Sequence, residues 1–139
     1  MPAVPTPFTA KDTIDFAAFE RFCALQLAAG ATALVVCGTT GEAPTLSAEA
    51  QGDLVLAARS VTRGRVPLIA GAGCNATARV IALSRAAQAA GADALLSVVP
   101  YYNKPTQAGI LAHFTAICGV CRSRGREITS RSMRARVWR

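Results

Sequence analysis

The sequence contains no long apolar run. None of its uncharged apolar stretches approaches the roughly 18 residues that a bilayer-spanning helix needs. The N-terminus reads Met-Pro-Ala-Val-Pro, so it also lacks the basic and apolar regions of a secretory signal. We therefore expect a cytoplasmic protein with no membrane partner.

Lysine is scarce, and the charge is unevenly distributed. The 139 residues include only Lys11 and Lys104, and Lys plus Arg (15) exceed Asp plus Glu (8), which gives a formal net charge of +7. Residues 1–117 contain eight basic and seven acidic side chains (+1), whereas residues 118–139 contain seven Arg and one Glu (+6). A uniformly basic nucleic-acid-binding surface is therefore excluded for residues 1–117.

The Arg-rich tail, residues 118–139, also breaks the hydrophobic pattern, because it has no apolar run long enough for a strand. We expect it to be unstructured and interpret it as non-native sequence, of the kind that a shifted reading frame would produce. The alternative is that the tail binds an anionic partner such as nucleic acid, but a solvated charge run is the commoner case. We therefore expect no nucleic-acid partner.

The five cysteines are an odd number and too sparse for the disulfide framework of a small secreted domain. We interpret Cys23, Cys37 and Cys74 as small reduced residues of the core. Cys118 and Cys121 could form a zinc site with His113, but a tetrahedral structural zinc needs a fourth protein ligand, and none is close in the sequence. We expect no metal.

Short apolar runs alternate with segments of helical periodicity. Strands that are apolar on both faces and alternate with helices are typical of a parallel sheet covered by helices. We predict four βα units, half of a (β/α)8 barrel, with a small open doubly wound sheet as the alternative. The predicted strands are residues 3–6, 33–37, 66–70 and 94–99, and the predicted helices are residues 16–27, 47–61, 75 or 77 to 91, and 106–117.

Two predicted helix ends repeat in sequence. Residues 26–34 (QLAAGATAL) resemble residues 88–95 (QAAGADAL) with one residue deleted, and Gly30 and Gly91 lie 61 positions apart. This distance fits two βα units of about thirty residues each.

Three segments that follow predicted strands, residues 38–42, 71–75 and 100–105, are the candidate site segments, because the carboxyl ends of parallel strands face the ligand in barrels and open sheets alike. Residues 38–42 (GTTGE) offer hydroxyls and amides that can bind a carboxylate, with an ordinary Gly-Thr loop as the alternative. The tyrosines of residues 100–105 (PYYNKP) offer a phenol that relays protons if it lies within hydrogen-bond reach of a hydroxyl such as that of Thr39. The alternative is an aromatic packing pair. No segment matches a phosphate-binding or dinucleotide-binding loop.

The order and spacing of four segments resemble the dihydrodipicolinate synthase (4-hydroxy-tetrahydrodipicolinate synthase) family. The resemblance extends from about residue 3 to residue 117 and implies the N-terminal half of a (β/α)8 TIM barrel, followed by the tail as a separate, basic segment. It implies a lyase of lysine (diaminopimelate) biosynthesis that condenses pyruvate, held as a Schiff base on a lysine, with aspartate semialdehyde. The matching segments are residues 5–8 (PTPF), 38–42 (GTTGE), 70–77 (AGAGCNAT) and 100–105 (PYYNKP).

The resemblance also implies a homo-oligomer, a dimer or tetramer, that needs no cofactor. The Thr-Thr form of residues 38–42 favours the synthase over the related N-acetylneuraminate lyases, which more often have Ser-Thr at this place. Another pyruvate-dependent aldolase or lyase of the same family remains an alternative.

By position in these motifs, the resemblance implies that Thr40 binds the pyruvate carboxylate and that Thr39 supplies the hydroxyl of a proton relay. Tyr102 would be the relay tyrosine that reaches into a neighbouring subunit's site, and Tyr101 would pack at that interface. The family's Schiff-base lysine on the sixth strand has no counterpart here, since Lys104 stands in the tyrosine loop, where a solvated basic residue is usual. We therefore expect a truncated fragment that is inactive alone and prone to self-association.

Overall fold

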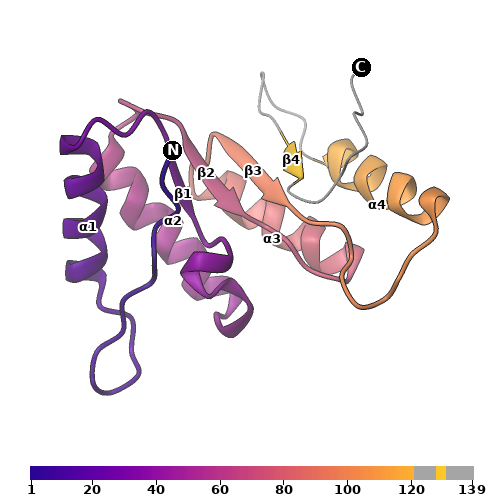
Figure 1. Cartoon of the computed structure of the whole chain (residues 1–139), viewed down its shortest axis with the longest axis horizontal. Helices are drawn as coiled ribbons and strands as arrows, with labels where there is room; N and C mark the ends of the chain where they lie inside the picture. Colours follow the sequence, from indigo (N-terminus) through magenta and orange to yellow (C-terminus); the bar gives the residue numbers. More distant parts are fainter. Residues whose placement is uncertain (121–127, 131–139) are drawn as a thin grey trace.

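A computed structural model describes residues 1–120 and 128–130 of the chain (Figure 1). Its strands form one parallel sheet in the order β1-β2-β3-β4, and helices α2, α3 and α4 each connect neighbouring strands. The elements are α1 (Phe16–Ala28), β1 (Leu34–Val36), the short 3-10 turns η1 (Thr39–Gly41) and η2 (Ala43–Thr45), α2 (Ala48–Thr62), β2 (Leu68–Gly71), α3 (Thr77–Ala89), β3 (Ala94–Ser97), α4 (Gln107–Val120) and β4 (Ile128–Ser130).

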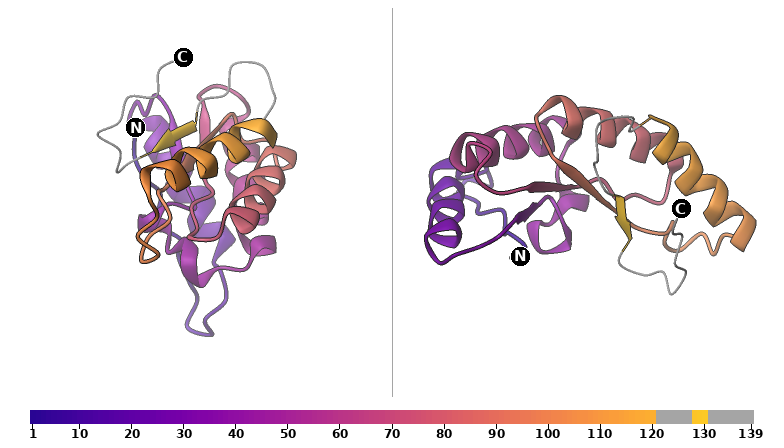
Figure 2. Two further views of the ribbon diagram at one scale, coloured as in Figure 1. Left: turned by 90° about the vertical axis from the view of Figure 1, so that its right-hand side faces the viewer. Right: turned by 90° about the horizontal axis from the view of Figure 1, so that it is seen from above.

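The long helices lie along one side of the curved sheet (Figure 2). Strand residues such as Leu34, Leu68 and Leu95 are buried in one cluster with Phe19 of α1 and Leu54 of α2. A doubly wound sheet has helices on both faces and a reversal of strand order, and this sheet has neither within its described strands. The predicted half-barrel is therefore confirmed, and the open doubly wound alternative is wrong.

The predicted first strand, residues 3–6, is reduced to a single parallel bridge between Ala3 and Val35. Two hydrogen bonds support it, from Val4 N to Val35 O (2.8 Å) and from Val35 N to Pro2 O (3.0 Å). Pro2 faces β1 without an N–H to donate, and Cys37, which this register puts opposite Pro5, has a left-handed φ of +53°, so the ladder extends in neither direction. The prediction of its position was right, but that of a full strand was wrong.

The repeated helix ends of the sequence have the same backbone structure. Gly30 and Gly91 both adopt left-handed φ angles, +84° and +93°, which a glycine reaches without a Cβ clash. After α1, Ala31 N donates to Gln26 O and Gly30 N donates to Leu27 O. After α3, the equivalent bonds run from Ala92 N to Ala87 O and from Gly91 N to Gln88 O, each shifted by 61 positions. The two helices therefore turn into β1 and β3 through the same cap, as the repeat predicted.

Helix α4 is attached to the rest of the molecule by a second, smaller apolar cluster. Its buried members are Cys74, Val80 and Ile117, with Ile81 and Phe114 packed against them. A hydrogen bond of 2.8 Å between Thr77 Oγ1 and His113 Nδ1 joins the start of α3 to α4. Burial lowers the pKa of His113, and the backbone of Val98 acts in the opposite direction.

The C-terminal part differs from the sequence prediction in two respects. Helix α4 continues to Val120, beyond the predicted end at residue 117, so the proposed boundary between barrel and tail lies inside a helix. The expectation of a tail without strands is wrong for Ile128–Ser130, which form β4 parallel to β3. The open edge of β3 supplies backbone partners, and Ile and Thr favour extended structure, so a strand forms without a long apolar run.

Candidate functional site

A cavity of about 240 Å³ opens at the carboxyl ends of β1, β2 and β3. All three segments that sequence analysis selected contribute to it, because parallel strands deliver their following loops to one edge of the sheet. The lining residues are Cys37, Gly38, Thr39, Ala43, Pro44, Gly71, Gly73, Leu96, Val98 and Tyr101.

The η1 turn presents donors that the described part of the chain does not use. Thr39 and Thr40 are exposed, and Thr39 lines the cavity while Thr40 follows it in the turn. Among the described residues, neither the side chains nor the amides of Thr39 and Thr40 have a hydrogen-bond partner. Two adjacent amides and two hydroxyls at a strand end can together bind an anion such as a carboxylate.

Interactions from other parts of the chain hold this turn in place. Gly41 N donates to Gly38 O (3.0 Å), and the buried Thr6 Oγ1 donates to Gly41 O (2.7 Å). Gln51 Nε2 donates to Ala43 O (2.9 Å) and to Leu46 O (3.5 Å), so α2 fixes the η2 wall of the cavity. The free donors of Thr39 and Thr40 are therefore carried on a rigid support.

The supporting role of Gln51 was not among the sequence predictions. The side chain is only 7% exposed, and it shares the buried face of α2 with Leu54, Val55 and Ala58. A polar residue in helical register with apolar ones is a signal for a buried side chain that bonds backbone groups. That signal was present in the sequence, although the carbonyls it would bind were not predictable.

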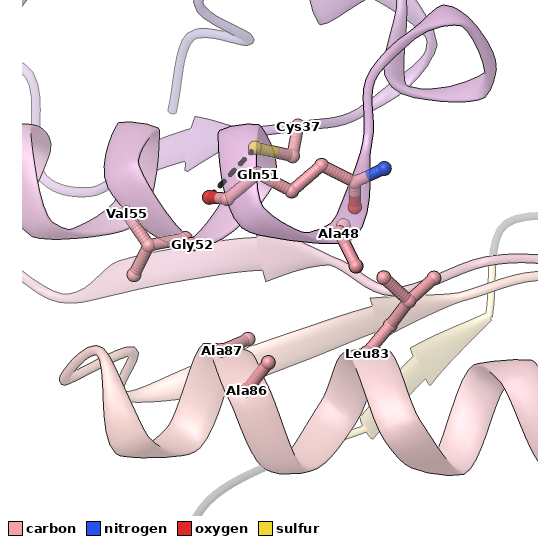
Figure 3. A pocket seen from close by; sticks show the side chains of 9 residues that line it. Cys37, Ala48, Gln51, Gly52, Val55, Leu83, Ala86 and Ala87 are labelled. Carbon is pink, nitrogen blue, oxygen red and sulfur yellow. Dashed lines mark hydrogen bonds between the residues drawn. The ribbon is translucent and has the colours of Figure 1, made fainter.

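Cys37 and Gly71 bring the ends of β1 and β2 into close contact. Cys37 has a left-handed φ of +53°, and a Cβ added at Gly71 would overlap its carbonyl group. The Cys37 thiol donates to Gln51 O at 3.6 Å (Figure 3). Burial raises the pKa of Cys37 to about 12, so it is a protonated thiol at neutral pH and no nucleophile for the cavity.

The three cysteines predicted to be reduced core residues, Cys23, Cys37 and Cys74, are buried and free. A second cavity beside Cys37, between the sheet, α2 and α3, measures only about 10 Å³ (Figure 3). Such a volume is at the limit for a single water molecule. It is a packing gap and offers no room for a substrate.

The two tyrosines occupy different environments. Tyr101 lines the cavity and is 50% exposed, whereas Tyr102 is 95% exposed and has a positive φ of +70°. Asn103 Nδ2 donates to Asn75 O (3.1 Å) and ties this loop to the loop after β2. Within residues 1–120, the tyrosines form neither a ring pair nor a hydrogen bond with Thr39. The described chain alone therefore assembles neither the relay nor the aromatic pair.

None of the described basic and metal-binding candidates lines the cavity. Lys11 and Lys104 are exposed, and neither lines it. His113 is buried with Nδ1 bonded to Thr77, Cys118 is exposed, and Cys121 lies outside the described residues. In the part of the chain that the structure describes, no three His, Cys, Asp or Glu side chains gather as a metal site. The same part contains no helix with the length and apolarity to cross a membrane.

Comparisons with known proteins agree with the fold. Residues 1–123 match the model of the Dihydrodipicolinate synthetase family. The 4-hydroxy-tetrahydrodipicolinate synthase of Salinibacter ruber is 53% identical over 116 residues, which are 84% of this chain and 38% of that protein.

Solved structures show the same partial coverage. The dihydrodipicolinate synthase of Bacillus anthracis superposes with a TM-score of 0.86 at 41% identity over 92% of this chain and 43% of its own. The synthase of Acinetobacter baumannii, solved in complex with pyruvate, gives 0.86 at 38% identity over 92% and 43%. The chain thus spans about two fifths of the length of these relatives. On the match over residues 1–123, the chain belongs to the dihydrodipicolinate synthetase family.

Proposed function

We propose that this chain forms the carboxylate-binding part of a synthase that condenses pyruvate with aspartate semialdehyde in lysine biosynthesis. The observation that carries the proposal is the cavity of about 240 Å³ at the carboxyl ends of the strands, which Thr39 and Tyr101 both line. Its wall includes a turn whose hydroxyls and amides are unpaired among the described residues. A small 2-oxo acid carries the anionic group that such a turn can bind.

The family resemblance suggests a role for each polar residue, and the geometry supports these roles to different degrees. The amide and hydroxyl of Thr40 would bind the pyruvate carboxylate, and Thr39 would pass a proton to or from the reacting atoms. Thr39 is well placed, because it lines the cavity directly. Formation of an enamine and cyclisation of the product both move protons in a shielded pocket, which is why hydroxyl groups are needed there.

Tyr102 completes this relay only if it acts on another subunit. At 95% exposure, it is the most exposed large aromatic side chain among the described residues, and Tyr101 beside it is half exposed. Exposed aromatic groups of this kind are often buried in interfaces. We therefore propose a homo-oligomer, a dimer or tetramer, in which Tyr101 packs at the interface and Tyr102 enters the neighbouring site.

The amine that forms the Schiff base must come from outside the 139 residues. Only Lys11 and Lys104 are present, and both are exposed and neither lines the cavity. Without an amine nucleophile in the pocket, pyruvate can bind but cannot be held covalently. We therefore propose that this chain alone has no synthase activity.

A cytoplasmic location belongs to the same proposal. The described cysteines, Cys23, Cys37, Cys74 and Cys118, are free thiols, as expected for a reducing compartment. Cell fractionation that recovers the chain with periplasmic or secreted proteins would contradict this part alone.

Binding and covalent capture of pyruvate test the two parts of the proposal separately. Saturation-transfer NMR with pyruvate should give a signal for the chain and lose most of it in Thr40→Val. The control Thr115→Val removes an exposed threonine on α4, far along the chain from η1, and should keep the signal. An equal signal from Thr40→Val would refute the carboxylate site.

Covalent capture addresses the missing amine. Borohydride treatment with pyruvate, followed by mass spectrometry, should leave the chain unmodified. A pyruvate adduct on Lys11 or Lys104 would refute the proposal that the amine lies elsewhere, while leaving the carboxylate site intact.

A further inference from the structure

The tail strand β4 covers an edge of the sheet that would otherwise be open. It pairs with β3 in parallel register, with Leu95 opposite Ile128, Leu96 opposite Thr129 and Ser97 opposite Ser130. Without β4, the backbone groups on this side of β3 would be free to pair with another strand, which is the usual origin of edge-to-edge association.

The register determines which backbone groups β4 occupies. Leu96 O accepts from Ala72 N on the β2 side, so the N–H and C=O of Leu95 and Ser97 point to the opposite side. In a parallel ladder with this register, the N–H of Thr129 faces the Leu95 carbonyl, and the N–H of Ser97 faces the Thr129 carbonyl. The N–H of Ser130 faces away from β3. Thr129 is therefore the residue whose backbone closes the edge.

The β4 segment has the properties of an edge that resists further pairing. It is three residues long, and the sequence around it contains Arg124, Arg126, Arg131 and Arg134. Very short edge strands and charged neighbours are two means by which natural sheets avoid joining one another. Two copies brought together at this edge would also bring two tails of net charge +6 together, which costs free energy at low salt.

The opposite edge of the sheet is protected only in part. Beside β1, Pro2 O and Val4 N bond to Val35, so the backbone groups of Ala3 and Pro5 face away from the sheet, and of these two residues only Pro5 lacks an N–H to donate to an incoming strand. The strand β4 therefore closes its edge more completely than the N-terminal segment closes the other.

We propose that β4 is an edge guard: residues 128–130 occupy the backbone groups of β3 and thereby prevent a second copy of this chain from extending the sheet there. The tail thus has a structural task in the chain as it stands. The partner that the guard excludes is a second copy pairing through β3, and this contact is separate from the interface proposed for the tyrosines.

A pair of proline variants of the full chain tests the guard. Thr129→Pro removes the N–H that faces Leu95, whereas the control Ser130→Pro, one residue later, removes an N–H that faces away from β3. In analytical ultracentrifugation of concentration series, Thr129→Pro should self-associate at least about tenfold more tightly than the wild-type chain, and Ser130→Pro should match the wild type. Higher salt should strengthen the association of Thr129→Pro, because it screens the arginines.

The hydrogen-exchange rate of the Ser97 amide reports the pairing of β3 with β4 directly, so it does not depend on how soluble the variants are. This amide should be protected in the wild type and in Ser130→Pro, and should exchange faster in Thr129→Pro. An unprotected Ser97 amide in the wild-type monomer would refute the pairing. Loss of protection in Thr129→Pro without tighter self-association would refute the guard, as would equal association in both proline variants.

Discussion

The two apolar clusters of the molecule differ in size and in how completely their polar groups are paired. Among the described residues, the large cluster joins 18 buried residues of β1, β2, α1, α2 and the adjoining parts of α3 and β3, whereas the cluster that holds α4 has three. Beside the large cluster, buried Thr6 and Gln51 have hydrogen-bond partners. Within residues 1–120, the buried side-chain atoms without a partner are Ser84 Oγ on α3, Ser97 Oγ on β3 and His113 Nε2 on α4.

Because the two clusters differ in size, the two walls of the cavity, the threonine turn and the tyrosine loop, should differ in stability. The threonine turn is supported by the large cluster through Thr6 and Gln51, so it opens only when that part of the chain unfolds. The tyrosine loop leads directly into α4, whose attachment consists of the small cluster and the contact between Thr77 and His113. Regions with few buried apolar contacts open at lower free energy, so we expect the tyrosine loop to be the more mobile wall of the cavity.

The largest effect is expected inside the large cluster, at Gly71. A methyl group there would overlap the Cys37 carbonyl, and backbone cannot rotate away as a side chain can. Gly71→Ala should therefore lower the free energy of unfolding by more than about 3 kcal/mol, measured by urea denaturation.

Gly52 provides the matched control for this substitution. It lies within α2, and a Cβ added there meets no atom within 4 Å. Gly52→Ala should stabilise the chain by up to about 1 kcal/mol, because alanine favours the helix. If Gly71→Ala proved as stable as Gly52→Ala, the close approach of β1 and β2 would be wrong.

An intermediate effect is expected at Asp93, which links β2 to the start of β3. Its Oδ2 accepts from the buried Leu68 amide (2.9 Å) and from Arg59 Nη1 (2.9 Å). Asp93→Ala leaves that amide unpaired and should cost about 2 kcal/mol in urea denaturation. Arg59→Ala removes only a partly exposed ion pair and should cost less than about 1 kcal/mol. If both variants lost the same free energy of unfolding, the stabilisation would come from the ion pair between Arg59 and Asp93 and not from the hydrogen bond of the Leu68 amide.

Much of this arrangement was predictable from the sequence. The helical and apolar periodicities placed α1 to α3 and β1 to β3 within a few residues, and the motifs after the strands identified Thr39, Thr40 and the tyrosine loop as neighbours. The predicted start of a helix at residue 47 was also right, since Ser47 Oγ accepts from Ala50 N at 3.1 Å and caps α2. These features are local, so short stretches of sequence determine them.

The remaining features depend on contacts between distant parts of the chain. No local pattern showed that residues 3–6 would form only one bridge, since pairing depends on where β1 leaves the extended conformation at Cys37. The strand β4 forms because the edge of β3 offers backbone hydrogen-bond partners. Its three residues are too few to show a hydrophobic periodicity in the sequence. Tyr101 and Tyr102 likewise lie in different environments because the backbone at Tyr102 has a left-handed φ. Two adjacent tyrosines in a sequence do not indicate such a backbone angle.

The smallest effect concerns the α4 attachment and its dependence on pH. His113 is 3% exposed, and burial lowers its pKa below the ordinary value of about 6.5. The folded chain therefore favours the neutral ring, and the unfolded chain takes up the proton first as the pH falls. Stability should be complete well above pH 6.5 and should decline as the pH falls below it.

Urea denaturation of the wild type and of His113→Asn at both pH values isolates this contribution. Asparagine cannot titrate in this range, so the variant should lose less stability on acidification, although it is less stable at pH 7.5. The amides of α4 should report the loss in hydrogen exchange before those of α2 do, because the titrating ring of His113 is on α4. Identical pH dependence in both proteins would rule out His113 as the titrating group, and simultaneous loss of protection in α2 and α4 would show that the two clusters unfold as one.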